Sequence, residues 1–266
     1  FLTGVYALIR RAPRLWWLWA TGFTAAMMVV MMVLAPVFIE PMFNKYEPVP
    51  PGPVRAALEV QAAKAGVPAD RIFMYDGSRQ SNNFTANAGG VFGTARIAIS
   101  DVAMKGASLD EVKAVTGHEI GHYVLGHTWR IVGLASLLAL VFFFLADRLF
   151  PRAARLFRSS ARTIADPVGL PVVLFLGGAL MLLLQPLLST FSRYSEAAAD
   201  QYSLETVNLP DALSSALVKT AEYRYPRPGP VEEFFFYDHP SVERRVRNAM
   251  EWKATHPPEP LPDAAG

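Results

Sequence analysis

Three stretches of the chain carry no charged residue, and the polar residues gather between them. The first, Leu15 to Ile39, and the third, Val168 to Ser192, each have 25 residues, enough for a helix to cross a hydrocarbon core of about 30 Å. The second, Ile131 to Ala146, has 16 residues, which falls short of that length at about 1.5 Å per residue. No helix breaker precedes it, so we expect one long helix to run from the upstream polar segment into the membrane. The pattern predicts a multi-pass integral membrane protein, with buried core helices as the alternative.

The polar segments predict further helices and a small β-sheet. Short strands are expected at residues 71–76 and 95–100, and a helix from Val54 that ends before Gly66. Ser108 and Glu111 fit a capping box, so a helix should begin there and continue through the His-rich stretch that follows. The predicted division is a juxtamembrane segment at 1–14, membrane helices at 15–39, 131–149 and 168–192, a catalytic segment with the sheet at 40–130, an Arg-rich loop at 150–167, C-terminal catalytic helices at 193–255 and a disordered tail at 256–266.

Composition narrows the classes of function. The 25 basic and 23 acidic residues nearly cancel, so nothing indicates a nucleic-acid partner. The chain has no cysteine, which excludes disulfides and thiolate metal sites. The mean hydropathy of +0.23 reflects the three apolar stretches rather than an even distribution.

Three of the five histidines lie in GHEIGHYVLGH, residues 117–127. His118 and His122 are four residues apart, so on a helix they share one face and can bind one metal ion. Glu119 sits beside them, where it can take a proton from water. This H-E-x-x-H pattern inside a predicted helix indicates a zinc-dependent peptidase.

A catalytic zinc site needs a third protein ligand and an open position. His127 is nine residues past His118, about 180° around a helix, so it can bind only if the helix breaks, and otherwise it caps or packs. Glu196 and Asp200, in SRYSEAAAD, are again four residues apart. One carboxylate can bind the metal while the other holds a ligand histidine by its free N–H. The three alanines between them would let this helix pack closely on another.

Four segments together resemble the integral-membrane zinc peptidases of the type I CaaX prenyl protease family, with the heat-shock membrane metalloproteases as a more distant branch. They are NAGGVFGTARIAISD, EVKAVTGHEIGHYVLGHT, SRYSEAAAD and DHPSVERRV, in the family's order. The resemblance implies a mainly α multi-pass membrane fold with a gluzincin-like catalytic domain that carries a small β-sheet. It also implies one Zn²⁺ ion bound by His118, His122 and Glu196, with Glu119 as general base.

The resemblance extends to residues outside the H-E-x-x-H motif. Asp200 and Arg245 match an aspartate and an arginine that support the ligands, and His239 matches a histidine that stabilises the oxyanion. Asn82, beside Asn83, matches an edge-strand asparagine that holds the substrate backbone, although this chain reads QSNN where the family usually has HSNA. From the residues alone, a histidine before proline and an asparagine of this kind are more typical of turns.

The sequence therefore predicts a membrane-embedded zinc metalloendopeptidase that acts on protein or peptide substrates, with a lipidated substrate as one possibility. A quality-control protease of the heat-shock type, a non-catalytic membrane scaffold and a structural metal site are the alternatives. The expected partners are the substrate and the lipid bilayer. Arginines before the first apolar stretch and in residues 148–162 favour a catalytic segment on the outer side, whereas the family places its zinc site toward the cytosol. Both orientations stay open.

Overall fold

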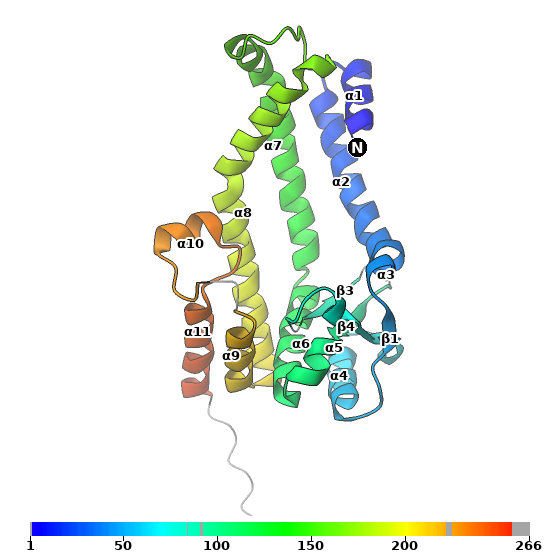
Figure 1. Cartoon of the computed structure of the whole chain (residues 1–266), viewed down its shortest axis with the longest axis vertical. Coiled ribbons are helices and arrows are strands. Elements are labelled where there is room, and N and C mark those ends of the chain that lie inside the picture. The colour runs from blue at the N-terminus through cyan, green and yellow to red at the C-terminus, as the bar shows by residue number, and fades with distance from the viewer. Residues whose placement is uncertain (1, 84, 91–92, 222–224, 257–266) are drawn as a thin grey trace, which may run out of the picture. The chain divides into compact units, whose positions relative to one another are not determined.

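The computed structural model describes residues 2–83, 85–90, 93–221 and 225–256, so the predicted disordered tail lies outside the described residues except for His256. The chain divides into two compact units. One unit consists of Phe1–Leu34 with Thr128–Leu187, and the other of Ala35–His127 with Leu188–Gly266. Figure 1 shows the elements of both units.

The first unit is built from helices, most of them long and apolar. These are α1 (Leu2–Arg11), α2 (Trp16–Leu34), most of α7 (His127–Leu156) and the first half of α8 (Leu170–Val207), which is preceded by the 3-10 turn η4 (Pro167–Gly169). Three helical stretches are long and apolar enough to cross a membrane, Trp16–Phe43, His127–Leu156 and Pro167–Val207. In their most apolar windows only 0%, 11% and 17% of the residues are buried, so the apolar side chains face outward, as lipid contact requires.

Two small clusters hold these helices together. Trp16 is almost fully buried against Phe143, and its indole N–H donates to a carboxylate oxygen of Asp147 at 2.7 Å. This bond gives the buried indole N–H an acceptor and partly offsets the free-energy cost of placing a carboxylate on an apolar helix. The second cluster centres on Phe150, whose ring lies against Gly169.

The expectation of one unbroken helix from the His-rich stretch into the membrane is wrong. The first helix, α6 (Leu109–Val124), ends two residues after His122, and α7 begins at His127. Gly126 separates them with a φ of +66°, a left-handed conformation that glycine adopts without strain and that commonly ends helices. The α7 helix also runs on through Pro151 to Leu156, so the predicted Arg-rich loop begins as helix.

The second unit contains a four-stranded sheet in the order β1-β2-β4-β3. The strands are β1 (Tyr46–Pro48), β2 (Ile72–Tyr75), β3 (Ala86–Gly89) and β4 (Arg96–Ser100). The two predicted strands are confirmed as β2 and β4, which pair in parallel, while β1 and β3 pair antiparallel on the outside. β4 is covered on both faces of the sheet, because Ile97 and Ile99 on one face and Ala98 on the other are all buried. β3 is an edge strand, with one side of its backbone unpaired within the sheet.

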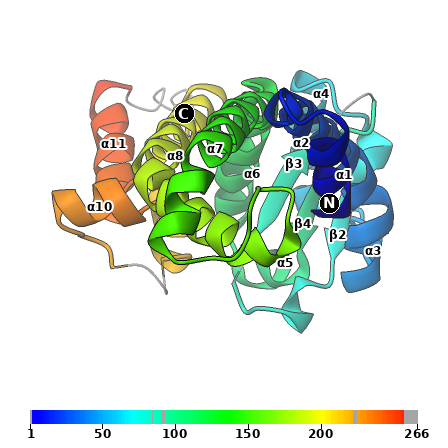
Figure 2. The same cartoon turned by 90° about the horizontal axis from the view of Figure 1, so that it is seen from above.

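The other elements of this unit are helices, some packed on the sheet and others on α6 or on one another, and α6 is central among them. They are η1 (Ala35–Ile39), α3 (Glu40–Phe43), α4 (Pro53–Lys64), η2 (Ala69–Arg71), η3 (Gly77–Arg79), α5 (Asp101–Gly106), α6, the second half of α8, α9 (Pro210–Lys219), α10 (Pro230–Phe236) and α11 (Val242–Thr255). Within this unit, α6 lies between the sheet and the C-terminal helices, with β3 on one side and α8 and α9 on the other (Figures 1 and 2). The His-rich helix therefore contacts both halves of the unit.

The start of α6 is fixed by the predicted capping box. The Ser108 hydroxyl accepts from the Glu111 amide and the Glu111 carboxylate accepts from the Ser108 amide. Glu111 is buried and also receives hydrogen bonds from Ser215 at 2.6 Å and from Lys219 at 2.8 Å, both on α9. Glu111 thus caps the start of α6 and also joins it to α9, about a hundred positions later in the chain. These contacts set the position of His118, which follows Glu111 by about two turns.

Candidate metal and active site

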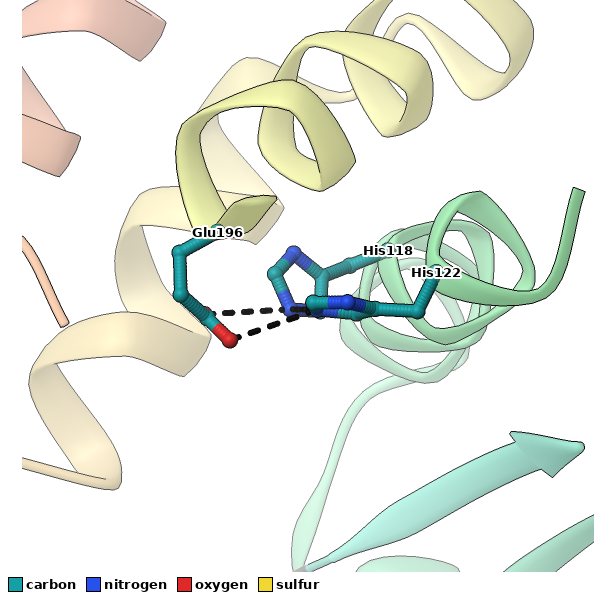
Figure 3. A group of neighbouring side chains, drawn as sticks. All are labelled: His118, His122 and Glu196. Atoms are coloured by element: carbon teal, nitrogen blue, oxygen red, sulfur yellow. Dashed lines mark hydrogen bonds and ion pairs between the residues drawn. The ribbon is translucent and has the colours of Figure 1, made fainter. Parts of the chain in front are cut away.

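His118 and His122 lie one turn apart on α6 and turn their Nε2 atoms toward each other, at a separation of 3.1 Å. Glu196 faces them from α8 (Figure 3). Its two carboxylate oxygens lie 3.4 Å from His118 Nε2 and 3.3 Å from His122 Nε2. The structure therefore brings together the three residues predicted as metal ligands, although Glu196 follows His122 by 74 residues in the chain.

Small residues allow the two helices to approach this closely. Gly121 lies between the two histidines, and a Cβ atom there would be 3.1 Å from the Ala199 Cα and 3.2 Å from the Ala199 carbonyl oxygen. Ala199 is fully buried. This confirms that the alanine segment packs closely on another helix, and it identifies Gly121 as the matching position on α6. A larger residue at either place would push Glu196 away from the imidazoles.

The donor set fits a divalent metal ion. Zinc binds imidazole nitrogen and carboxylate oxygen at about 2.0–2.2 Å, and a tetrahedral arrangement at that distance separates neighbouring ligand atoms by about 3.3–3.5 Å. The three separations observed, 3.1, 3.3 and 3.4 Å, are close to this value. Among the described residues this is the group of three histidine or acidic side chains that could hold a metal ion. Three protein ligands leave a fourth position open.

A buried ion-pair network supports His118 from behind. The Nδ1 atom of His118 lies 2.9 Å from an Asp200 carboxylate oxygen, and Arg245 donates to both oxygens of Asp200 at 2.7 Å. The side chains of all three residues are about nine-tenths buried. Asp200 can thereby accept the Nδ1–H of His118, which leaves Nε2 free to bind a metal, and Arg245 holds the carboxylate in place.

The surroundings raise the pKa of His118. Burial lowers this pKa, but the hydrogen bonds to Asp200 and Glu196 outweigh that effect, so the pKa reaches about 10. The same acidic surroundings favour a metal cation, which competes with a proton for Nε2. Burial also raises the pKa of Glu119, against the effect of His118 and His122. A raised pKa suits a carboxylate that must accept and return a proton near neutral pH.

His239 lies at the edge of the same group. Its Nε2 atom is 3.4 Å from Glu196, and its Nδ1 atom is 2.8 Å from the carboxylate of Asp238, its neighbour in the chain. The His239 side chain is partly exposed, so it can donate to a molecule bound above the three ligand atoms. No role was predicted for Asp238, although the dipeptide Asp-His is a signal that could have indicated this orienting contact.

His127 does not join the three ligand atoms, even though the helix breaks before it. It is buried, and its Nδ1 atom lies 2.9 Å from the Nδ1 atom of His122. It therefore contacts the side of the His122 ring that faces away from Glu196. This agrees with the expectation that His127 packs when it does not bind the metal, and its position depends on the turn at Gly126.

Asn82 and Asn83 lie before the edge strand rather than on it. Both precede β3 by three or four residues, and the Asn83 amide donates to the Ser81 hydroxyl at 3.0 Å, as in a turn. The residues that occupy the edge strand beside α6 are Ala86–Gly89. The edge strand beside α6 therefore consists of small residues, whose side chains leave room for an extended peptide to bind along the strand.

A helix carrying H-E-x-x-H, closed by a glutamate from a second helix in a chain with membrane-length helices, is typical of a membrane metallopeptidase. A sequence model described as peptidase family M48 matches residues 50–258. A second, described as the CAAX prenyl protease N-terminal domain with five membrane helices, matches residues 1–45. The first match covers most of the chain, so the chain belongs to peptidase family M48.

Individual relatives agree with this assignment. The chain is 30% identical over 250 residues to the uncharacterized metalloprotease YhfN of Bacillus subtilis, covering 92% of this chain and 58% of that protein. It is 29% identical over 246 residues to CAAX prenyl protease 1 of Saccharomyces cerevisiae, covering 84% and 53%. It is 32% identical over 236 residues to a CAAX prenyl protease 1 homolog of Arabidopsis thaliana, covering 87% and 54%.

The fold is also that of a solved relative. The crystal structure of S. mikatae Ste24p matches with a TM-score of 0.82 and 26% identity, over 93% of this chain and 62% of that one. Together with the three apolar helices, these matches show a multi-pass integral membrane protein. The chain spans a little more than half the length of the curated relatives that it matches.

Proposed function

We propose that this chain carries the active site of a membrane-embedded zinc metalloendopeptidase. The observation that supports it most is the meeting of His118 Nε2, His122 Nε2 and the Glu196 carboxylate at separations of 3.1–3.4 Å. Two nitrogens, one oxygen and an open fourth position are a donor set that catalytic zinc prefers. A structural zinc site would need a fourth protein ligand, and His127 instead contacts the far side of His122.

The residues around this centre have distinct roles in the proposed hydrolysis. Zinc held there would supply a Lewis acid that polarises the scissile carbonyl and lowers the pKa of water toward neutral. Glu119, with its raised pKa, takes a proton from the attacking water and delivers it to the leaving amine. His239 donates to the oxyanion that develops on the carbonyl, and Asp238 orients its ring.

The edge strand gives the substrate a place to bind. β3 lies beside α6 and has an unpaired side, so an extended peptide can add to the sheet through backbone hydrogen bonds. Asn82 and Asn83 stand just before this strand and can bind one end of such a peptide. This arrangement recognises the peptide backbone rather than a particular side chain, which suits an endopeptidase.

Proteins or peptides are the proposed substrate class, and a lipidated C-terminus is the finer proposal. Several relatives carry the name CAAX prenyl protease 1, which supports it. Cleavage of membrane proteins in quality control is the other candidate. A peptide assayed with and without an attached prenyl group separates the last two candidates. Only a preference for a lipidated C-terminus requires kcat/KM to fall when the lipid is removed.

Glu119→Gln tests the mechanism. The variant keeps both imidazoles and Glu196, so it should bind one metal ion per chain, as measured by elemental analysis of the purified protein. It should lose nearly all peptide hydrolysis, because glutamine cannot accept the proton. Glu251→Gln, the same change at an exposed position on α11, is the matched control and should cleave like the wild type. Hydrolysis by Glu119→Gln at the wild-type rate, or a wild type that binds no metal, would contradict the proposal.

A further inference from the structure

The short helix α10 presents an apolar surface that stays exposed among the described residues of its unit. Four of its seven residues are large, apolar and exposed, Val231 at 71%, Phe234 at 47%, Phe235 at 39% and Phe236 at 71%. Only Glu233 points inward, where it accepts hydrogen bonds from the Ser241 amide at 3.3 Å and from Arg244 at 3.0 Å. We call Val231 and Phe234–Phe236 the α10 aromatic surface. Three adjacent exposed phenylalanines are costly in water and indicate a binding surface.

Arg193 fixes the α10 aromatic surface at one position along the axis of α8. Its guanidinium donates to the carbonyl oxygens of Tyr237 at 2.6 Å, Glu233 at 2.8 Å and Phe234 at 3.4 Å. These carbonyls belong to the last turn of α10 and the residue after it, where a helix leaves acceptors unsatisfied. A positive charge there is also favoured by the helix dipole. The orientation of α10 on α8 is therefore held by three hydrogen bonds from one side chain.

Arg193 stands at the point on α8 where the uncharged, membrane-length run of residues ends. It is the first charged residue after the uncharged run Val168–Ser192, and α8 is one helix through both. The residues directly before it, Leu188–Ser192, belong to the same unit as α10. The next residue, Tyr194, is 69% exposed, and tyrosines at such a boundary are typical of the membrane interface. The α10 aromatic surface thus lies where the apolar part of α8 ends.

We infer that α10 is an interfacial helix whose aromatic surface inserts into the lipid headgroup and acyl boundary of the bilayer. At seven residues it is far too short to cross the membrane, and Glu232 is exposed on it, so it can only lie in the plane of the interface. The lipid bilayer is already the environment of the helix that holds it. Insertion places α10, and three residues later His239, at a fixed depth beside the membrane surface.

A peptide substrate is a less suitable occupant of this surface. Within the second unit, α10 projects on the side of α8 opposite to β3 (Figures 1 and 2). The candidate peptide-binding edge and the α10 aromatic surface therefore face different regions. A second copy of the chain is the other candidate occupant, and dilution of the protein in lipid separates it from the bilayer, because contact between copies is lost on dilution.

The absence of cysteine from the chain allows single-site labelling. Phe236→Cys and Val231→Cys, both at strongly exposed positions, would each be labelled with an NBD fluorophore. Glu251→Cys, exposed on the polar helix α11 of the same unit, is the matched control. The labelled proteins are reconstituted at low protein-to-lipid ratio into vesicles of phosphatidylcholine and phosphatidylglycerol. Equal metal content of the variants and the wild type verifies folding.

Insertion predicts opposite quenching on α10, at residues 231 and 236, and on α11, at residue 251. NBD at residues 231 and 236 should emit at shorter wavelength, lose most of its emission to lipids with a nitroxide near the headgroup, and resist iodide in the water. NBD at residue 251 should show the reverse. Equal iodide quenching at 236 and 251 would overturn the inference. Protection from iodide without nitroxide quenching, or protection that disappears when the protein is diluted in lipid, would also overturn it, the latter in favour of a second copy.

Discussion

The Nδ1 atom of His127 lies 2.9 Å from the Nδ1 atom of His122, across the break between α6 and α7. Since Nε2 of His122 faces Glu196, its Nδ1 carries the hydrogen when a metal is bound, and His127 accepts it. His127 therefore orients His122 as Asp200 orients His118. Each imidazole of the proposed metal site has its own partner, one a carboxylate and the other a second imidazole.

His127→Ala should weaken metal binding without preventing folding. Losing a hydrogen-bond partner of a ligand histidine typically costs about 10–100-fold in metal affinity. Competition with a chelator of known zinc affinity, at fixed pH, measures this loss directly. His127→Gln restores an acceptor and should recover part of the affinity. His256→Ala, which removes an exposed histidine stacked on Trp252, is the control and should bind metal like the wild type. Equal affinity of His127→Ala and wild type would contradict the orienting role.

Arg245→Met should destabilise the protein through Asp200. The two hydrogen bonds from Arg245 disappear, and Asp200 is left as a buried carboxylate without its cation. Breaking one partner of a buried ion pair usually costs about 3–5 kcal/mol in the free energy of unfolding. Thermal or denaturant unfolding of the protein in detergent measures the change.

The double variant separates this charge effect from a loss of packing. Asp200→Asn combined with Arg245→Met removes both charges, so it should cost clearly less than the sum of the two single variants. Strictly additive costs would show that Arg245 acts through packing alone. Arg247→Met, at an exposed residue of the same helix that pairs with Glu243, should change the free energy of unfolding by less than about 1 kcal/mol.

The parts of the site that follow from local spacing could be predicted from the sequence. His118 with His122, and Glu196 with Asp200, are each four residues apart, so helix geometry alone places each pair on one face. The capping box at Ser108 is equally local, and the structure confirms it. None of these predictions required knowledge of how distant segments pack.

Contacts between distant segments could not be predicted in this way. Arg245 lies 45 residues from Asp200, and only the resemblance to a known family connected them. The contact of His127 with His122 depends on the left-handed turn at Gly126, and a glycine permits such a turn without requiring it. Asn82 was expected on the edge strand, but strand boundaries depend on pairing with β4, and pairing begins only at Ala86.

Glu111→Gln should lower stability in a pH-dependent way. Burial raises the pKa of Glu111, but hydrogen bonds from Lys219, Ser215 and the Ser108 amide outweigh it and hold the pKa at about 2. A lowered pKa means that the carboxylate stabilises the folded state above its unfolded pKa of about 4.3, by up to about 3 kcal/mol, and loses this as pH falls toward 2.

Melting temperatures of wild type and Glu111→Gln at a series of pH values check this prediction. The variant should melt lower at pH 5 to 8 by a constant difference, and the difference should shrink below about pH 4, where Glu111 of the unfolded wild type binds a proton that the folded state does not yet take up. A difference that grows on acidification would contradict the sign. Asp110→Asn, at the exposed neighbouring residue, should leave the melting temperature nearly unchanged at every pH.

Gly121→Ala should disturb the metal site by separating α6 from α8. The added methyl group would meet backbone atoms of Ala199 at 3.1–3.2 Å, and backbone cannot rotate away as a side chain can. The two helices must therefore move apart by a few tenths of an ångström. His118 and His122 lie on either side of this contact in the chain, so Glu196 moves away from both. Chelator competition should show weaker metal binding even where the variant folds and reconstitutes normally.

Gly133→Ala is the matched control, because the same change in α7 meets no atom within 4 Å. In a helix interior this substitution ordinarily stabilises, by about 0.5–1 kcal/mol, so the control should melt at the wild-type temperature or above it. Gly121→Ala has the same gain in helix propensity, and any net loss must therefore come from the contact with Ala199. A variant at residue 121 that melts higher and binds metal with wild-type affinity would show that α6 and α8 can separate without moving Glu196.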